Sequence, residues 1–415
     1  MGKPTLLTGC RALDLTTESG FLCGKMLADL GVDVIKVERP GGDVARHIAP
    51  YWGNIPGPER SLYWLSYNAD KRGITLDIET DEGRKIFFDL LQGADFVIES
   101  FVPGYMKRLG LDYATLSKLK PGLVMVSISA FGQSGPYSTY MGPDLVVMGM
   151  SGQLFLTGDA DRPPLNISLP QACLHAGADA AVGSMIAYRH ARKTGVGQHV
   201  DISLQQSAAW FLATAVPYWE LSNTVLGRVG SRRSGGSSDA IQRQVWPCRD
   251  GFVFFFMIGG QQGAKTGRQL VQWMADSGAS DPFLSNFDWN TFNMASATQE
   301  LIDRISDPVA RFFMNKSKAE LLEAATTRNI SICPLFSMED ILNDANLAAR
   351  EFWTQVEYPE LEASIPYPRS YVRSSVNSTE TRARAPGIGQ HNVEVYAALG
   401  LTAKDMAALQ ARGVI

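Results

Sequence analysis

The feature that most constrains the fold is a strand–helix–strand pattern close to the N-terminus. Residues 12–16 (ALDLT) are typical of a buried strand, and residues 19–30 repeat leucine and methionine at helical spacing up to Gly31. Residues 34–38 (VIKVE) then have the pattern of a second buried strand. Two such strands joined by one helix form a βαβ unit, which requires parallel strands and a right-handed crossover.

The same alternation continues further along the chain. Asp81 can cap a helix that ends at Gly93, and residues 95–99 (DFVIE) follow as a strand. A short helix near residues 112–119 leads to another strand at residues 123–129. The sequence therefore predicts an α/β fold in which a doubly wound, Rossmann-like sheet forms the large domain.

The middle of the chain predicts helices and then a loop. A long helix is expected at residues 173–193, with basic residues in its last turn and Gly195 as its cap. Residues 203–222 have the composition of a second apolar helix. Residues 227–238 are rich in glycine, serine and arginine, which is typical of a linker or loop.

Composition argues against several classes of function. The net charge of −4 is unlike that of nucleic-acid-binding proteins, which need a basic face. The five scattered cysteines include no CxxC pair and the five histidines no HExxH, so we expect no metal site. The N-terminus lacks the apolar core of a signal peptide, and the longest apolar run, residues 252–258, is too short to span a bilayer. We therefore expect a cytoplasmic protein that does not bind membranes.

Several segments carry motifs that occur in the same order in one protein family. They are residues 12–46, 68–78, 99–113, 127–137, 142–152, 193–204 and 384–401. The segment KTGVGQHVDISL at residues 193–204 is among the most diagnostic of them. Together these segments resemble family III CoA-transferases, the formyl-CoA/carnitine CoA-transferase family. The resemblance extends along nearly the whole chain and is weakest at residues 225–380.

The resemblance implies a domain organisation that agrees with the strand and helix pattern. A chain of 415 residues is too long for one ordinary core, so more than one domain is expected. We expect a large CoA-binding α/β domain at residues 1–200, a linker at 201–224, a smaller α/β domain at 225–325 and a C-terminal return segment at 326–415. In the family two chains form interlocked rings, so the linker and the return segment would thread the partner chain.

The resemblance also implies a binding site for coenzyme A, with an acyl-CoA as substrate. Arg39 would face the nucleotide end of CoA and Arg108 a phosphate, because guanidinium groups suit phosphates. Leu76 and Phe101 would flank the adenine, which needs an apolar slot. Glu79 stands where the family usually has lysine, and Val102 stands where it often has a basic residue. Both departures predict weaker or repositioned binding of CoA.

The family's chemistry needs a carboxylate that this chain lacks. That carboxylate attacks the acyl-CoA thioester to give a mixed anhydride, then carries CoA as an enzyme thioester. Its position, fixed by the helix glycine that matches Gly177, is occupied by Cys173, and the nearest acid along the sequence is Asp179. A helix N-terminus would favour the thiolate of Cys173, yet an acyl-cysteine cannot carry CoA through an anhydride. We expect a retired site with no catalytic residue on this chain.

Two other sets of residues invite a functional interpretation. His175 and Asp179 are four apart on one helix face and could form an acid–base pair, although a capping and hydrogen-bonding pair is the simpler interpretation. Arg232 and Arg233 in the loop at 227–238 could meet a second carboxylate of a dicarboxylic substrate beneath a lid. An exposed basic loop explains the same sequence.

A family member without its carboxylate can still serve as one subunit of a pair. Benzylsuccinate CoA-transferases resemble such pairs, in which only one subunit keeps the Asp. We therefore expect a paralogous Asp-containing partner subunit, with succinyl-CoA as donor and benzylsuccinate as one candidate acceptor. The alternatives are an acyl-CoA lyase or isomerase of the same fold and a non-catalytic acyl-CoA-binding scaffold. A racemase of this fold would need a histidine where Pro143 stands and an acid at Cys173.

Overall fold

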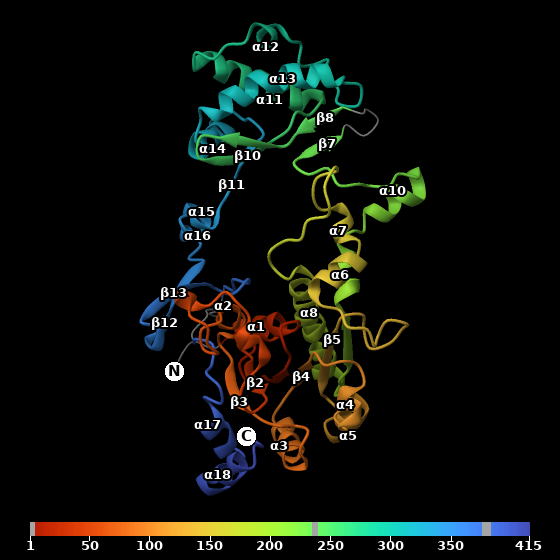
Figure 1. The fold of residues 1–415 in the computed structure, drawn as a ribbon, viewed down its shortest axis with the longest axis vertical. Helices are drawn as coiled ribbons and strands as arrows, with labels where there is room; N and C mark the ends of the chain where they lie inside the picture. Colours follow the sequence, from red (N-terminus) through yellow and green to blue (C-terminus); the bar gives the residue numbers. More distant parts are fainter. Residues whose placement is uncertain (1–4, 235–239, 376–382) are drawn as a thin grey trace. The chain divides into compact units, whose positions relative to one another are not determined.

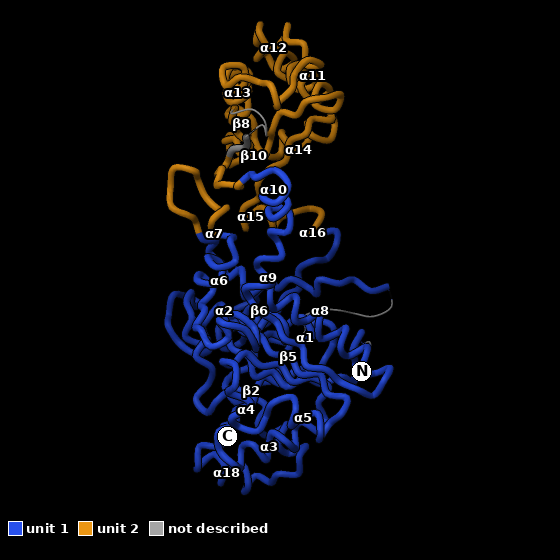
Figure 2. Tube along the Cα trace, turned by 90° about the vertical axis from the view of Figure 1, so that its right-hand side faces the viewer, with its two compact units in different colours: residues 1–153, 166–224, 348–415 blue, residues 154–165, 225–347 orange. Residues whose placement is uncertain are grey.

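The computed structural model describes residues 5–234, 240–375 and 383–415, which form two compact units. The larger unit comprises residues 1–153, 166–224 and 348–415, and the smaller unit comprises residues 154–165 and 225–347 (Figure 2). The larger unit is therefore assembled from three separate stretches of sequence.

A six-stranded parallel sheet forms the centre of the larger unit. Its strands lie in the order β3-β2-β1-β4-β5-β6, and every neighbouring pair is parallel. Figure 1 labels β2, β3, β4 and β5 of this sheet. The strands are β1 (Arg11–Leu15), β2 (Asp33–Glu38), β3 (Arg72–Thr75), β4 (Phe96–Glu99), β5 (Val124–Ser129) and β6 (His199–Ser203). This is the doubly wound order, and it confirms the predicted α/β class.

Helices cover both faces of this sheet and have bounds near those predicted. The first βαβ unit consists of β1, α1 (Phe21–Asp29) and β2, as the hydrophobic pattern indicates. The other helices of this unit are α2 (Leu62–Asn68), α3 (Asp81–Gln92), α4 (Tyr105–Arg108), α5 (Tyr113–Leu119), α6 (Asp144–Met150), α8 (Gln171–Thr194), α9 (Leu204–Trp210), α10 (Ala215–Ser222), α17 (Asn392–Ala397) and α18 (Ala403–Ala411).

Helix α8 packs closely against α1, and a glycine permits the approach. A Cβ atom on Gly177 would lie 2.8 Å from Cβ of Leu22, closer than side chains normally approach. Gly195 ends α8 with φ of 77°, the left-handed conformation predicted for its cap. The long helix is thus confirmed, with Cys173 in its first turn.

Two predictions in this unit are wrong in detail. The cap of α3 is Thr80, whose hydroxyl accepts the amide hydrogen of Gly83 at 3.0 Å, while Asp81 is the first helical residue. The expected continuous helix at 203–222 is two helices, α9 and α10. Pro217 explains the break, because a proline inside a helix lacks an amide hydrogen and collides with the preceding turn. The chain instead starts a new helix with Pro217 in its first turn.

A buried ionic network joins the first two strands to the segment before β3. Nζ of Lys71 donates to Asp14 Oδ2 at 2.8 Å, to Asn68 Oδ1 at 3.0 Å and to the Phe21 carbonyl at 3.0 Å. Burial alone would raise the pKa of Asp14, but the neighbouring Lys71 and Lys36 hold it below its ordinary value. The motif NADKRG therefore has a structural role, since all three hydrogens of its lysine are satisfied.

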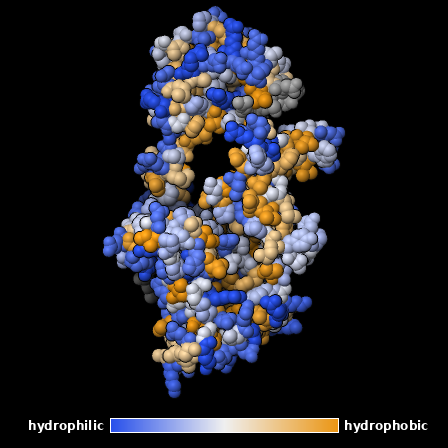
Figure 3. Space-filling model, viewed as in Figure 1, coloured by the Kyte–Doolittle hydropathy of each residue, from blue (hydrophilic) through white to orange (hydrophobic). Residues whose placement is uncertain are grey.

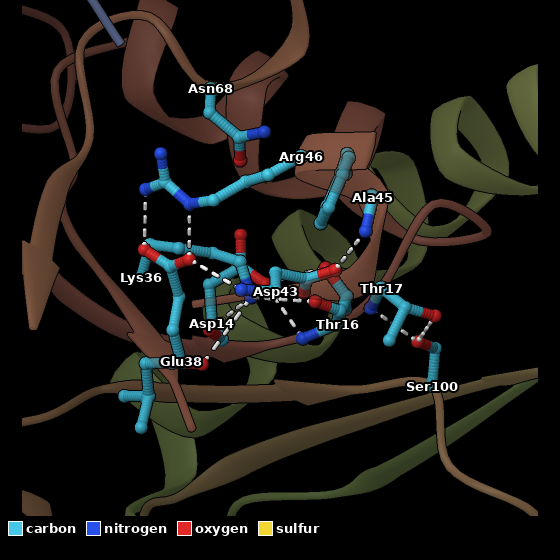
Figure 4. Close-up of polar contacts among 12 residues, drawn as sticks. Asp14, Thr16, Thr17, Lys36, Glu38, Asp43, Ala45, Arg46, Asn68 and Ser100 are labelled. Atoms are coloured by element: carbon cyan, nitrogen blue, oxygen red, sulfur yellow. Dashed lines mark hydrogen bonds and ion pairs between the residues drawn. The ribbon is translucent and has the colours of Figure 1, made fainter. Parts of the chain in front are cut away.

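A second buried pair orders the loop after β2. Arg46 donates from Nε and Nη2 to the two carboxylate oxygens of Glu38, at 2.7 and 2.8 Å (Figure 4). Both side chains have no exposed surface, and the guanidinium lies 3.8 Å from the ring centre of Trp64. Such a two-point contact fixes the loop that follows Glu38, including Arg39 and Asp43.

The C-terminal segment covers the edge of the sheet at β3. Gly73 donates its amide hydrogen to Nδ1 of His391 at 3.0 Å, and Thr75 donates to Oδ1 of Asn392 at 2.9 Å. The amide of His391 in turn donates to the Gly73 carbonyl at 2.9 Å. Helix α17 then packs beside β3, and α18 packs against α17 (Figure 1). The edge strand is therefore paired, although its partners are mostly side chains.

The smaller unit is built around a three-stranded sheet and its own aromatic core. The sheet has the order β11-β10-β9, with antiparallel neighbours. Its core includes Trp246, Phe255 and Phe313. The elements from here to the return are β7 (Arg232–Ser234), β8 (Ile241–Arg243), β9 (Val245–Cys248), β10 (Gly251–Phe255), α11 (Gly260–Asp276), α12 (Pro282–Asn286), α13 (Gln299–Met314), α14 (Lys318–Thr327), β11 (Ile332–Leu335), α15 (Met338–Leu342) and α16 (Ala345–Ala349). A hairpin of β12 (Trp353–Tyr358) and β13 (Ala363–Pro368) belongs to the larger unit.

Candidate functional site

A cavity of about 290 Å³ lies at the carboxyl ends of β1, β2 and β3. Ligands of open α/β sheets bind at this end of the strands, because the loops there diverge. The wall is largely apolar and includes the buried side chains of Val37, Leu76 and Ile78, with Phe101 from the loop after β4. Its size is near the lower limit of about 300 Å³ for ligand pockets, so it suits one ring system better than a whole large ligand.

The polar floor of the cavity is held by the networks described above. Glu38 and Asp43 line the cavity, but both carboxylates already pair with cations of the protein. Glu38 pairs with Arg46, and Asp43 lies 3.6 Å from Nζ of Lys36 (Figure 4). Thr17 completes this side, with its amide donating to the Ser100 hydroxyl at 2.8 Å. The charged groups of the floor are therefore fixed by partners within the protein. A charged part of a ligand would have to bind to side chains at the rim.

The rim carries a compact group of charged and aromatic side chains. Nη2 of Arg39 donates to Glu79 Oε1 at 3.0 Å, and the Tyr105 hydroxyl donates to the same oxygen at 2.7 Å. The hydrogen bond from Tyr105, and then the charge of Arg39, hold the pKa of Glu79 below its ordinary value. The guanidinium of Arg108 lies 5.1 Å from the centre of the Tyr105 ring.

The structure brings three of the four predicted binding residues to one cavity. Arg39, Leu76 and Phe101 all line it, while Arg108 reaches it only through Tyr105. Val102 is exposed beside them. Tyr105 is a lining residue that the sequence analysis did not single out. Tyr105 follows Phe101 by four residues, and this aromatic spacing in the sequence could have indicated it. In the structure the two ring centres lie 4.5 Å apart.

Cys173 lies elsewhere in the larger unit and is almost fully buried. Its amide donates to Oδ1 of Asp144, the first residue of α6, at 3.0 Å. Burial raises the pKa of the Cys173 thiol, and the carboxylates of Asp144 and Glu18 raise it further. The expectation that the helix N-terminus favours a thiolate is therefore wrong, because desolvation and two nearby acids outweigh the helix dipole.

Sequence separation concealed the neighbours of Cys173. Asp144 and Glu18 come from two distant segments, whereas spacing along the sequence pointed only to Asp179. Burial is also the main cause of the raised pKa values of Tyr63 and Tyr67, to which the Cys173 group adds. The surroundings of Cys173 are therefore acidic and aromatic, with Asp144, Glu18, Tyr63 and Tyr67 as neighbours.

His175 and Asp179 lie in different surroundings. The ring of His175 packs 4.1 Å from that of Phe211, and its Nδ1 is buried with no hydrogen-bond partner within the part of the chain that the structure describes. Asp179 is exposed and lines a separate polar cavity with Asp201 and Trp210. Neither the acid–base pair nor the expected hydrogen-bonding pair describes this arrangement.

The basic loop predicted as a lid is only partly within the described residues. The backbone of Arg232–Ser234 pairs with Ile241–Arg243 as an antiparallel ladder. Residues 235–239 lie outside the described residues, as do the side chains of Arg232 and Arg233. Over the described ranges, no group of three or more His, Cys, Asp or Glu could hold a metal ion, and no helix is long and apolar enough to cross a membrane.

Glu99, at the end of β4, should make stability depend on pH. Its carboxylate accepts the amide hydrogen of Phe101 at 2.7 Å, and burial raises its pKa from 4.5 to about 7. The folded state then binds more protons than the unfolded state between these two pH values. The resulting stability is fully present below pH 4.5 and is lost as the pH rises through about 7.

We expect Glu99→Gln to flatten this pH dependence by roughly 3 kcal/mol between pH 4.5 and 8. Urea unfolding of both proteins across this range measures the difference. The exposed Glu323→Gln is the matched control and should keep the wild-type slope. Parallel curves for wild type and Glu99→Gln would show that Glu99 is ionised in the folded protein at neutral pH.

Comparison with known proteins places the chain in a protein family. The family model described as CoA-transferase family III matches residues 7–392. The chain is 35% identical over 406 residues to the BbsE subunit of succinyl-CoA:(R)-benzylsuccinate CoA-transferase of Thauera aromatica, covering 98% of this chain and 97% of that protein. It is 31% identical to succinyl-CoA–D-citramalate CoA-transferase of Chloroflexus aurantiacus, covering 99% and 98%.

Solved structures agree with these relatives. The crystal structure of a CAIB/BAIF family protein from Brucella suis superposes with a TM-score of 0.78 at 28% identity, covering 96% of this chain and all of that one. Rv3272 from Mycobacterium tuberculosis gives a TM-score of 0.73 at 22% identity, covering 95% and 99% and supporting the fold alone.

Proposed function

The chain belongs to CoA-transferase family III, and we propose that it is the subunit without a catalytic Asp in a heteromeric CoA-transferase. The assembled enzyme would move CoA from an acyl-CoA such as succinyl-CoA to a carboxylic acid, for which benzylsuccinate is one candidate. The observation that carries the proposal is the buried Cys173 thiol, which faces Asp144 and Glu18 at the position where the family resemblance expects the carboxylate.

The reaction explains why this substitution matters. A carboxylate attacks the thioester carbonyl and releases CoA thiolate, leaving a mixed anhydride. The thiolate then attacks the enzyme's own acyl carbon, which frees the donor acid and leaves CoA bound as a thioester. The acceptor acid repeats the sequence in reverse. A thiol can take the acyl group but has no acyl carbon of its own to which CoA could be joined.

The surroundings of Cys173 also oppose a thiol mechanism. A nucleophilic cysteine needs a lowered pKa and a basic or cationic neighbour. Cys173 has the opposite: burial and the acids Asp144 and Glu18 raise its pKa. The same two carboxylates would repel the carboxylate of an acceptor acid. These charges support a site that no longer performs the transfer.

Binding of acyl-CoA to this subunit is the second part of the proposal. We assign the adenine to the cavity between Leu76 and Phe101, with Arg39 at the nucleotide end of CoA and Arg108 near a phosphate. The apolar wall, the ring of Phe101 and the two cations supply the chemistry that an adenine nucleotide needs. Glu79 lowers the positive charge available at the rim.

Exposed apolar side chains support a partner subunit. Val216, Trp219 and Leu221 of α10 expose 61, 53 and 84% of their surface, and Trp210 at the end of α9 exposes 75%. Figure 3, in the same view as Figure 1, shows apolar surface in orange over the segment that contains α10. Soluble monomers rarely leave such a group of large apolar residues uncovered. The relative from Thauera aromatica is itself named a subunit. We propose an Asp-containing paralogue as the partner, in the interlocked arrangement of the family.

Native mass spectrometry tests the assembly. We expect the chain co-expressed with a family III paralogue that keeps the Asp to form a complex containing both chains. Trp219→Asp should weaken this complex at least about tenfold, because a charge would be buried at the interface. Glu220→Gln, next to it, is the exposed control. A stable assembly of this chain alone that excludes the paralogue would overturn the heteromer.

A second candidate function follows from the pair of acids beside Cys173. Burial, then Asp43 and Asp144, raise the pKa of Glu18, as is typical of a group that transfers protons. An acyl-CoA lyase or isomerase could use Glu18 and Asp144 as acid and base. Such an enzyme would change the acyl group of an acyl-CoA with no second acid present, whereas the proposed subunit would not.

A further inference from the structure

We propose that Glu79 makes the rim of the nucleotide cavity select a free ribose hydroxyl over a ribose phosphate. A thioester of dephospho-CoA, which lacks the 3′-phosphate of CoA, would then bind at least as tightly as the CoA thioester. The inference rests on the proposed binding of acyl-CoA at this cavity and adds which form of the nucleotide the cavity prefers.

Glu79 partly neutralises the charge of Arg39, the cation that lines the cavity among the residues that the structure describes. Nη2 of Arg39 donates both to Glu79 Oε1 at 3.0 Å and to the Tyr105 hydroxyl at 3.2 Å. A phosphate that bound Arg39 would have to compete with a carboxylate already paired to it. It would also approach the negative charge of Glu79 at short range, which opposes binding.

The corner of the cavity beside Arg39 carries more negative than positive charge. Asp77 lines the cavity, and its Oδ1 accepts the amide hydrogen of Glu79 at 2.9 Å, so two carboxylates lie beside Arg39. A second guanidinium, that of Arg84, donates to the Glu79 carbonyl at 2.7 Å but is paired with Asp81. Both acids contribute to the raised pKa of Arg39, after the hydrogen bond that Arg39 donates to Tyr105. The positive charge of Arg108, whose guanidinium lies over the Tyr105 ring, can neutralise the second carboxylate. No net positive charge then remains to bind a further dianion.

The same carboxylate is well suited to a hydroxyl. Glu79 does not itself line the cavity, but it bonds to two residues that do, Arg39 and Tyr105. Both hydrogen bonds to Glu79 from the described side chains go to Oε1, which leaves Oε2 able to accept from a ligand at the cavity mouth. In dinucleotide-binding sheets an acid near a strand end accepts a ribose hydroxyl, whereas an arginine receives a ribose phosphate. Glu79 follows the end of β3 and lies at a comparable edge of the sheet. The rim therefore has the acceptor for a hydroxyl and not the open cation for a phosphate.

Calorimetry on the full chain tests the preference, with CoA and dephospho-CoA as the two probes. We expect dephospho-CoA to bind wild type at least as tightly as CoA. Glu79→Gln should tighten CoA binding about tenfold, because it frees Arg39 and removes a repulsive charge. Its affinity for dephospho-CoA should change by less than about threefold, since the amide oxygen can still accept the hydroxyl.

The control is Glu82→Gln, which makes the same change of charge on an exposed residue that pairs with Arg412. It should leave both affinities unchanged. CoA binding wild type tenfold more tightly than dephospho-CoA would overturn the selectivity while leaving the proposed function intact. If neither nucleotide binds, the proposed acyl-CoA site fails, and the selectivity fails with it.

Discussion

Purified alone, the chain is expected to exchange CoA between succinyl-CoA and labelled succinate at least about a thousandfold more slowly than the assembled enzyme. Cys173 cannot form the anhydride, and its raised pKa keeps the thiol neutral. Mixing with the Asp-containing paralogue should restore exchange. Incorporation of the label into succinyl-CoA measures both states directly.

Three variants sharpen this experiment. Cys173→Ala should leave the activity of the assembled enzyme within about twofold, because the residue takes no part in the reaction. The Asp→Ala change in the paralogue should abolish it. Exchange by this chain alone that disappears in Asp144→Asn would overturn the proposal and make Asp144 the nucleophile. Loss in Cys173→Ala instead would assign the reaction to the thiol.

Lys71→Met is expected to destabilise the protein by about 3–5 kcal/mol. The variant removes three hydrogen bonds and leaves the buried Asp14 carboxylate without its closest cation. The surroundings of Asp14 are closely packed, since a Cβ atom on Gly24 would lie 2.2 Å from Asp14 Oδ2. Urea unfolding of wild type and variant measures the loss in the free energy of unfolding.

The double variant Asp14→Asn/Lys71→Met separates charge from packing. If the unpaired carboxylate is the main cost, neutralising it should recover about half of the lost stability or more. Lys404→Met, at an exposed position, is the control and should stay within about 0.5 kcal/mol of wild type. A loss below about 1 kcal/mol in Lys71→Met would mean that the pair does not stabilise the fold.

Local patterns in the sequence were sufficient for most of the large unit. The strands at β1 and β2 and the long helix α8 follow from apolar spacing and from glycine caps such as Gly195, which depend on neighbouring residues alone. The break before Pro217 was missed because the apolar composition of residues 203–222 continues across it. Proline restricts backbone geometry without changing that composition.

The candidate sites depend on contacts that no local pattern reports. The grouping of Arg39, Leu76 and Phe101 came from the family resemblance, and the parallel sheet explains it by bringing the ends of neighbouring strands together. The acids around Cys173 could not be predicted from spacing. Asp144 comes near it because α6 packs against α8, and Glu18 lies just before α1, which also packs against α8. Their effect on the thiol pKa depends on burial, which became known only with the fold.

The covered edge of the sheet has a consequence for biosynthesis. β3 is complete once Thr75 has left the ribosome, yet the side chains that close its edge belong to His391 and Asn392. For most of translation the nascent sheet must present an open strand, the kind of surface that pairs with other chains and aggregates. Residues 225–347 can collapse around their own core during that interval. Protection of the open edge by chaperones would then matter most just before residue 390 emerges.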